Sequence, residues 1–387
     1  MGIISSIKKK DEAKLIYEKR IRLNMTQKEL ADSIGMPKYG DRTIRRWENS
    51  ETKPTPLELK AILEFPENAP YKNNPNADYK MIDLFAGIGG TRLGFQLTGR
   101  TQAVFSSEID KFAIKTYHAN FGETPHGDIT KIDANDIPDH DILVGGFPCQ
   151  AFSQAGLKKG FEDTRGTLFF EIARILKHKQ PKAFLLENVK NLLNHDNGKT
   201  YSVIDSTLKE LGYAVSLLVY HAKDFGVPQN RERIYIVGFN KNKVHNYMDF
   251  NTPVPPKLDV RVGDILEHNV NPKYTISDKL WEGHQRRKKD NKAAGKGFGY
   301  SIFNESSPYT NTISARYYKD GSEILIEQKG KNPRKITPRE AARLQGFPND
   351  FIIPVSDTQA YKEFGNSVAV PVVKIIAEEI INVLDKI

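Results

Sequence analysis

Cysteine is almost absent from this chain, because Cys149 is the only one among its 387 residues. A single cysteine excludes an internal disulfide framework and a zinc site built from several thiolates. The chain also lacks an apolar run of membrane-spanning length, a signal peptide, internal repeats and low-complexity tracts. These absences predict a cytoplasmic protein without a metal or a membrane partner.

The chain does contain an ordinary globular composition with an excess of positive charge. Hydrophobic residues make up 39% and charged residues 27% of it, and 387 residues are enough for two or three domains. The formal net charge is +9. This charge permits a nucleic-acid partner without establishing one.

Residues 1–70 are predicted to form a small all-α domain. Thr26 and Glu29 form a capping box at the start of one helix, and a second helix with basic side chains follows at about 42–49. This order resembles the helix-turn-helix of phage-repressor-type regulators, whose second helix enters the major groove. The resemblance implies that Arg42 and Arg45 contact operator DNA. The alternative is a helical packing or dimerisation module with a solvated basic face.

Beyond a Pro- and Asn-rich linker, placed at 71–78, strands and helices alternate. This alternation predicts an α/β fold with a mostly parallel sheet and helices on both faces. The catalytic domain is placed at 79–254, and a C-terminal segment, 356–387, returns to it. The expected strands are 80–85, 102–107, 142–144, 183–186, 213–220 and 234–239.

A glycine turn follows the first of these strands and is the candidate cofactor site. Gly87 and Gly89 allow the backbone to approach a ligand closely at a helix N-terminus. Glu108, which ends the second strand, is placed to hold two ribose hydroxyls. The spacing departs from the G-x-G-x-x-G pattern, so it disfavours NAD and predicts another nucleotide-like cofactor.

Side chains that can do chemistry follow the later strands. Cys149 lies on a Gly- and Pro-shaped loop, Glu187 ends another strand, and Arg231 and Arg233 alternate onto one face of a third. Ligands bind beyond the carboxyl ends of parallel strands, so Cys149 and Glu187 are expected in one cleft. Each has a plainer alternative: a small buried hydrophobe for Cys149, a helix cap for Glu187 and solvated side chains for the arginines.

As an ordered set, these motifs resemble the cytosine carbon-5 DNA methyltransferases from about residue 79 to the C-terminus. The motifs are 83–90, 145–150, 187–189, 229–233, 339–348 and 365–368. The resemblance implies a Rossmann-like S-adenosylmethionine-dependent methyltransferase fold. It also implies S-adenosylmethionine as methyl donor and a cytosine in double-stranded DNA as acceptor.

The same resemblance implies a role for each residue of the site. Cys149 adds to carbon-6 of a flipped cytosine, Glu187 bonds to ring nitrogen-3, and Arg231 and Arg233 supply positive charge. The implied cofactor contacts are Phe85, Gly87, Gly89, Glu108, Asp128, Ile129 and Asn366. The implied contacts to the base or the DNA are Pro148, Gln150, Ser153, Thr312 and Arg316.

Residues 255–355 are predicted to form a small, mostly-β target-recognition domain. The segment 251–335 holds 16 Lys and Arg residues against 10 Asp and Glu residues, with aromatic residues between them. Its local sequence resembles that of enzymes that modify the inner cytosine of CC-(any or A/T)-GG sites. This resemblance gives a hypothesis about the target.

The leading interpretation is a monomeric restriction-modification methyltransferase whose helix-turn-helix also binds operator DNA. One alternative is a helix-turn-helix regulator with a vestigial methyltransferase body. Another is an RNA cytosine-5 methyltransferase on the same fold.

Overall fold

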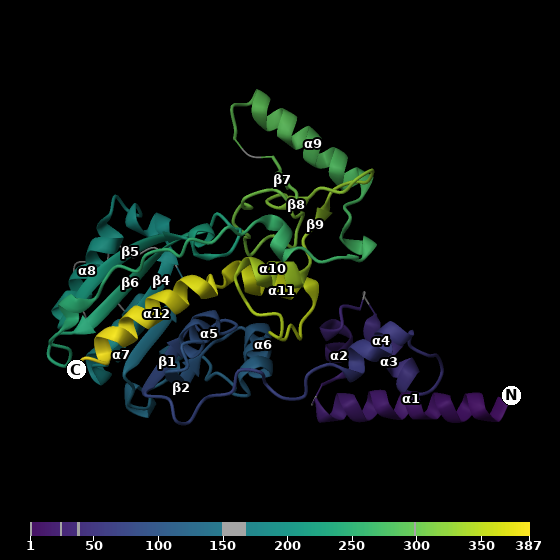
Figure 1. Cartoon of the computed structure of the whole chain (residues 1–387), viewed down its shortest axis with the longest axis horizontal. Coiled ribbons are helices and arrows are strands. Elements are labelled where there is room, and N and C mark those ends of the chain that lie inside the picture. The colour runs from purple at the N-terminus through teal and green to yellow at the C-terminus, as the bar shows by residue number, and fades with distance from the viewer. Residues whose placement is uncertain (1, 24, 37–38, 149–167, 298) are drawn as a thin grey trace.

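The computed structural model describes residues 2–23, 25–36, 39–148, 168–297 and 299–387. A helical unit lies at one end of the molecule, an α/β body lies at the other, and a smaller segment stands above their junction (Figure 1). The N-terminus belongs to the helical unit, and the C-terminus lies on the far side of the body.

The helical unit has the predicted organisation. Its helices are α1 (Gly2–Arg22), α2 (Gln27–Ser33), α3 (Gly40–Glu48) and α4 (Pro56–Leu63). The capping box forms at α2, because the Thr26 hydroxyl accepts the Glu29 N–H at 3.2 Å and the Glu29 carboxylate accepts the Thr26 N–H at 2.8 Å. Ile16, Leu30 and Trp47 are part of a small core that joins the four helices.

The segment between the helical unit and the sheet is held against the body. The Asn73 amide bonds to both backbone groups of Ala103, accepting at 2.9 Å and donating at 2.7 Å. Its oxygen also accepts from the guanidinium of Arg92 at 3.0 Å. The Tyr71 N–H donates to the carbonyl of Asn120 at 2.9 Å. This segment, 71–78, is therefore an anchored strap.

The predicted strands form one six-stranded sheet in the order β2-β1-β3-β4-β6-β5. They are β1 (Tyr79–Leu84), β2 (Thr101–Ser107), β3 (Ile142–Gly146), β4 (Ala183–Val189), β5 (Tyr213–His221) and β6 (Glu232–Asn240). The pairs among β1 to β4 are parallel, whereas β6 is antiparallel to β4 and β5. The sheet is therefore mixed.

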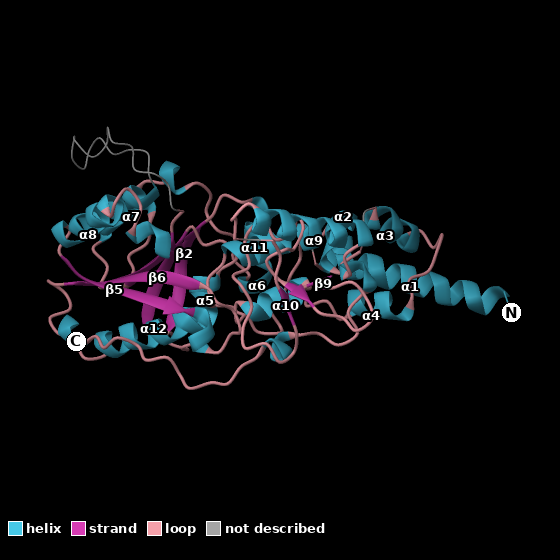
Figure 2. Ribbon diagram, turned by 90° about the horizontal axis from the view of Figure 1, so that it is seen from above, coloured by secondary structure: helices cyan, strands magenta, loops and turns pink. Residues whose placement is uncertain are grey.

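Helices cover both faces of the sheet (Figure 2). They are α5 (Gly90–Gln96), α6 (Lys111–Phe121), α7 (Leu168–Lys179), α8 (Lys199–Glu210) and α12 (Val370–Leu384). Successive residues of β1 point to opposite faces: Met81 packs with α5 and α12, and Ile82 packs with α7 and α8. No helix of the described part of the chain is long and apolar enough to cross a membrane.

The segment above the junction contains less strand than the sequence suggested. It holds three two-residue strands, β7 (Ile302–Phe303), β8 (Leu325–Ile326) and β9 (Arg334–Lys335), and a helix of 16 residues, α9 (Asp278–Ala293). Helix α9 was not predicted from the sequence, because His284 is its one buried residue. A helix without an apolar stripe gives no helical periodicity.

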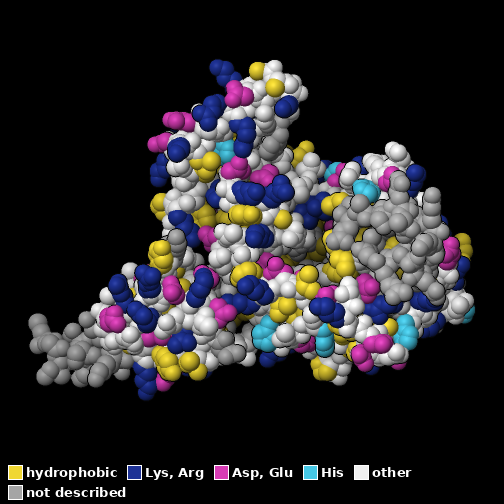
Figure 3. All heavy atoms as spheres, turned by 180° about the vertical axis from the view of Figure 1, so that it is seen from behind, with side chains coloured by type: hydrophobic (Ala, Val, Ile, Leu, Met, Phe, Trp, Pro, Cys, Tyr) yellow, Lys and Arg dark blue, Asp and Glu magenta, His cyan; other side chains and the backbone are white. Residues whose placement is uncertain are grey.

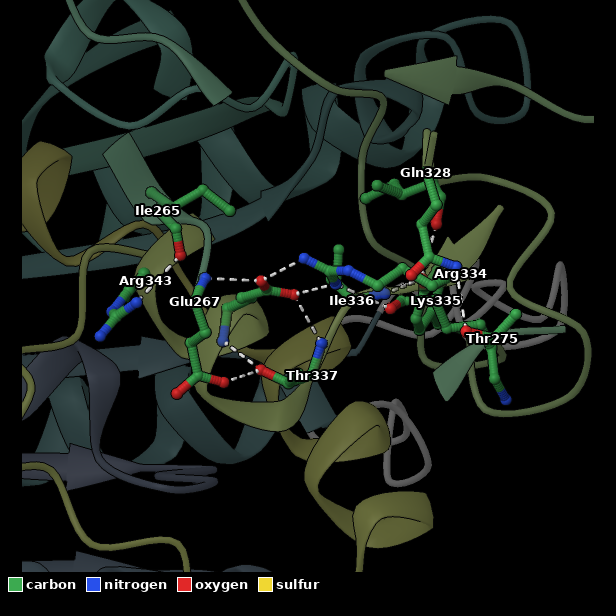
Figure 4. Close-up of polar contacts among 12 residues, drawn as sticks. Ile265, Glu267, Thr275, Gln328, Arg334, Lys335, Ile336, Thr337 and Arg343 are labelled. Atoms are coloured by element: carbon green, nitrogen blue, oxygen red, sulfur yellow. Dashed lines mark hydrogen bonds and ion pairs between the residues drawn. The ribbon is translucent and has the colours of Figure 1, made fainter. Parts of the chain in front are cut away.

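A buried ion pair fastens this segment to α10 (Pro338–Leu344). Both terminal nitrogens of the Arg334 guanidinium, Nη1 and Nη2, donate to the Glu340 carboxylate, at 2.7 and 2.8 Å. The same carboxylate accepts the N–H groups of Glu267 and Thr337, in the network of Figure 4. The carboxylate is satisfied on all sides, so it fixes the segment to α10, which is followed by α11 (Asp357–Asn366).

Candidate active site

A cavity of about 450 Å³ opens beyond the carboxyl ends of β1, β3 and β4. This is where ligands bind in open α/β sheets. Its wall combines the glycine turn after β1, the residues after β2, the ends of β3 and β4, two arginines from 231–233, and α11 with the residues that follow it. Among the lining residues are Phe85, Gly87, Glu108, Pro148, Glu187, Arg231, Arg233 and Asn366.

The glycine turn has an unusual backbone. Phe85, Gly87 and Gly89 have φ values of 56°, 54° and 82°. A positive φ is costly for phenylalanine, and such strain clusters at functional sites. A Cβ on Gly90 would lie 2.6 Å from the Ser367 hydroxyl, so the turn packs directly against the C-terminal motif. Gly89 packs on Phe121 and is not among the lining residues.

Glu108 organises the wall beside this turn. Its carboxylate accepts the N–H groups of Gly87 at 2.7 Å and of Ile109 and Asp110 at 2.8 Å. A carboxylate offers about four acceptor positions, so it retains capacity for a hydroxyl. Ile109 is 73% exposed and lines the cavity, as an apolar side chain that a flat ring can cover. Ile109 was not among the predicted site residues, although its position next to Glu108 is a usable signal.

Asp128 and Ile129 lie outside the cavity lining. The Asp128 carboxylate accepts the N–H and the hydroxyl of Thr130, and these bonds lower its pKa. Ile129 is buried in the core beneath α7. For these two residues, contact with the cofactor stays a prediction.

Glu187 and Arg233 form an ion pair inside the cavity, with 3.0 Å between Oε1 and Nε. Burial raises the pKa of Glu187, while the nearby charges of Arg233 and Arg231 act in the opposite direction. The neighbouring Asn188 amide donates to the carbonyl of Phe147 at 2.8 Å, which fixes the end of β3 against β4.

Arg231 lines the cavity beside Arg233 and is held by backbone carbonyls. Its guanidinium donates to the carbonyls of Ile313, Gly365 and Ser367, at 3.4, 3.3 and 2.5 Å. Burial lowers its pKa, but a guanidinium remains charged at neutral pH. Arg231 therefore joins the segment above the junction to the C-terminal motif, and Arg233 alone of the two pairs with Glu187.

Cys149, Gln150 and Ser153 lie outside the described residues. Pro148, which directly precedes Cys149, lines the cavity, and so does Leu168, where the described chain resumes. The sequence analysis also missed the lining residues Asp110, Lys362 and Ser367.

The predicted DNA contacts lie in two separate places. The Thr312 hydroxyl donates to the carbonyl of Asn230 at 2.8 Å, beside Arg231, and Arg316 is exposed in the same segment. The other place is α3 in the helical unit, where Arg42 and Arg45 are exposed. The Cζ atom of Arg42 lies 4.8 Å from the centroid of the Tyr39 ring.

Comparison with known proteins agrees with this geometry. A family model described as C-5 cytosine-specific DNA methylase matches residues 79–382, and a helix-turn-helix model matches residues 16–67. The chain is 74% identical to the type II methyltransferase M.SsoII of Shigella sonnei, over 96% of this chain and 98% of that protein. It is 73% identical to the type II methyltransferase M1.ScrFI of Lactococcus lactis subsp. cremoris, over 96% of each.

Solved structures show the same fold at lower identity. The methyltransferase EhMeth of Entamoeba histolytica superposes with a TM-score of 0.65 at 20% identity, over 80% of this chain and 99% of that one. Together with the cavity at the strand ends, the family match shows that this chain belongs to the C-5 cytosine-specific DNA methylases, as a DNA (cytosine-5)-methyltransferase with an N-terminal helix-turn-helix domain.

Proposed function

We propose that the protein is a type II modification methyltransferase, which methylates carbon-5 of one cytosine in a specific duplex site and so protects DNA from a cognate endonuclease. The names of its two relatives at 74% and 73% identity support the class. The proposal depends on one observation: Glu108 and the Glu187–Arg233 ion pair line the same cavity.

The residues of the cavity fit S-adenosylmethionine. Glu108 would hold the ribose hydroxyls, Phe85 and Ile109 would pack on the adenine, and Asn366 would close the pocket. A space of about 450 Å³ falls within the range of small-molecule sites. When bound, this cofactor supplies an electrophilic methyl group.

The chemistry of the base belongs to Cys149 and Glu187. Carbon-5 of cytosine is a poor nucleophile, and addition of the Cys149 thiolate to carbon-6 makes it reactive. Protonated Glu187 would donate to ring nitrogen-3 and offset the charge that develops there. Its burial supports this form, because burial raises the pKa of a carboxyl. The target base must leave the duplex to reach this cavity.

The exposed arginines of α3 support a second role. We infer that the helix-turn-helix binds operator DNA through Arg42 and Arg45 and regulates the transcription of its own locus. Arg316 and Thr312 would meet the target duplex, for which a CC-(any or A/T)-GG site remains the working hypothesis.

One experiment tests the enzyme and its nucleophile together. Labelled methyl from S-adenosylmethionine is offered to unmethylated duplex DNA and to RNA, with the wild type and Cys149→Ala. We expect label in DNA that is lost in the variant, and the labelled fragments then locate the site. Transfer to RNA alone would favour an RNA methyltransferase, and no transfer by folded protein would favour a regulator with a vestigial body.

A further inference from the structure

Helix α9 carries a concentration of positive charge that the proposed chemistry does not use. The helix contains six Lys and Arg residues, five of them between residues 286 and 292, against three Asp and Glu residues, a net charge of +3. The helix projects from the molecule (Figure 1), and Lys and Arg side chains gather along it in Figure 3.

One side of α9 is anchored to the rest of the protein. Trp281 packs edge-on against the ring of Tyr300 at 4.9 Å. His284 bonds to the carbonyl of Asp320 at 3.2 Å, and Arg287 bonds to the Asp320 carboxylate at 2.9 Å. These contacts hold the helix as a rigid element and leave its opposite side to solvent.

The solvent-exposed surface of α9 bears a stripe of three cations, which we name the outer stripe: Arg286, Lys289 and Lys292. Their spacing of three residues places them along one face, over about 9 Å of helix. All three are exposed, and none forms an ion pair with a residue that the structure describes. Like charges three residues apart repel one another.

On three other helices of the chain, surface lysines are paired with carboxylates. Pairs four residues apart join Lys14 to Glu18, Lys209 to Asp205 and Lys374 to Glu378. Glu282 and Asp290 lie four residues from Arg286, but no ion pair joins them to it among the described contacts, and Lys289 and Lys292 have no acidic residue four positions away. The charge of the outer stripe is therefore available to a partner.

We propose that α9 is a phosphate-binding arm, whose outer stripe contacts the backbone of duplex DNA beyond the target site. The inference rests on the proposed action on duplex DNA. Asp320, to which α9 is bound, belongs to the same loop as Arg316, and that loop packs on Gly365 beside the cavity. On this proposal, duplex bound at the cavity continues past α9, where exposed cations complement its regular row of phosphates.

The test is the salt dependence of binding. The variant Arg286→Gln/Lys289→Gln/Lys292→Gln keeps good helix formers at exposed positions, so the fold is expected to persist. Fluorescence anisotropy measures its affinity for a random-sequence duplex of about four helical turns across a range of salt concentrations. Each lost phosphate contact lowers the slope of log affinity against log salt by about 0.9, so we expect a slope shallower by roughly 1 to 3.

A matched control has the same change of charge elsewhere. Lys80→Gln/Lys241→Gln/Lys243→Gln alters three exposed lysines at the sheet edge opposite the cavity, and its slope should equal that of the wild type. An unchanged slope in the α9 variant, or an equal loss in the control, would overturn the proposal.

Methyl transfer at saturating DNA separates this proposal from the proposed function. We expect the α9 variant to keep the wild-type kcat, because the outer stripe is remote from the reacting atoms. A lower kcat with an unchanged slope would show that α9 positions the target and does not bind phosphates. If the wild type transfers no methyl group, the proposed function fails, while the binding slopes still test α9.

Discussion

Glu187 experiences two opposing effects inside the cavity. Burial raises its pKa, whereas Arg233 at 3.0 Å and the nearby Arg231 favour the carboxylate. The proposed chemistry needs the protonated form. The rate of methyl transfer should therefore fall as the pH rises through the pKa of Glu187 in the bound complex.

Glu187→Gln removes the proton that can be transferred but keeps the shape of the side chain. We expect kcat to fall about 100- to 10,000-fold, the usual contribution of a general acid, with little change in DNA affinity. Single-turnover methyl transfer and a binding assay measure the two effects. Glu232→Gln, a carboxylate of β6 paired with Lys190, is the control and should keep its activity. A Glu187→Gln enzyme with the wild-type kcat would contradict the role of Glu187.

Glu363 on α11 is a second buried carboxyl, and it gives a prediction about stability. One of its oxygens accepts from the Thr116 hydroxyl at 2.9 Å, and the other has no partner. Burial is the main cause that raises its pKa well above the usual value; Asp110 adds to this, and Thr116 and Lys115 oppose it. The folded state therefore holds a proton that the unfolded chain releases, so the free energy of unfolding falls as the pH rises above about 4.3.

Glu363→Gln should remove this dependence. Between pH 5 and pH 8 the wild type should lose about 1 kcal/mol or more of stability relative to the variant, as measured by denaturant unfolding at both pH values. Glu378→Gln, an exposed carboxylate on α12, should behave as the wild type does. Parallel pH profiles for wild type and Glu363→Gln would contradict the protonated state.

The two arginines of the cavity show what a local sequence pattern can predict about a side chain and what it cannot. Alternation along a strand predicted that Arg231 and Arg233 share one face, and both side chains line the cavity. It could not give their partners. Arg231 bonds to Gly365 and Ser367, more than 130 residues away along the chain, and only the folded arrangement brings them together.

At the scale of elements, Gly365 marks a contact that tolerates no side chain. A Cβ there would lie 2.5 Å from backbone atoms of Ser314 and Ala315, which cannot move as a side chain does. Gly365→Ala should separate α11 from the 314–315 loop and cost about 1–3 kcal/mol or more, the range for overpacking. Thermal unfolding and methyl transfer measure the loss.

Gly283→Ala in α9 is the matched substitution. No atom lies within 4 Å of the Cβ that it would add. Alanine also favours a helix over glycine, so this variant should be slightly more stable than the wild type. Equal stability of the two variants would show that the contact at Gly365 is not restrictive.

Elements with an apolar pattern were predictable, and those without one were not. All six strands of the sheet lie within a few residues of their predicted ranges, because buried strands need apolar runs. The sequence of α9 is rich in charged residues and predicts a solvated segment, so only the structure shows that it is a helix. The tiny strands β7 to β9 are too short to leave a pattern of alternation.

For the whole molecule, the helical unit is fixed to the body at several points. Lys115 of α6 pairs with Glu29 at 3.5 Å. Lys273 donates to the carbonyl of Gly35 at 3.1 Å and pairs with Asp357 at 2.9 Å. With the strap at 71–78, these contacts set the direction in which α3 presents Arg42 and Arg45. Composition predicted a linker here, but the contacts of Asn73 depend on residues distant in sequence.

This anchoring predicts that two truncations will differ. A chain that begins at residue 71 keeps the strap and should retain methyl transfer while it loses operator binding. A chain that begins at 79, where the family match begins, loses Asn73 and leaves both backbone groups of Ala103 and one bond of the buried Arg92 unsatisfied. We expect it to be less stable by about 2–4 kcal/mol, measured by denaturant unfolding.

Asn73→Ala in the full-length chain tests whether these bonds are the cause. It removes these three hydrogen bonds and a fourth, from the Asn73 amide to the Glu123 carboxylate, without shortening the chain, so it should reproduce most of the loss while operator binding remains. Equal stability of the two truncated chains would contradict an anchored strap. Loss of methyl transfer in the chain that begins at 71 would instead show that the helix-turn-helix unit is required by the catalytic body, and that the two are not separable modules.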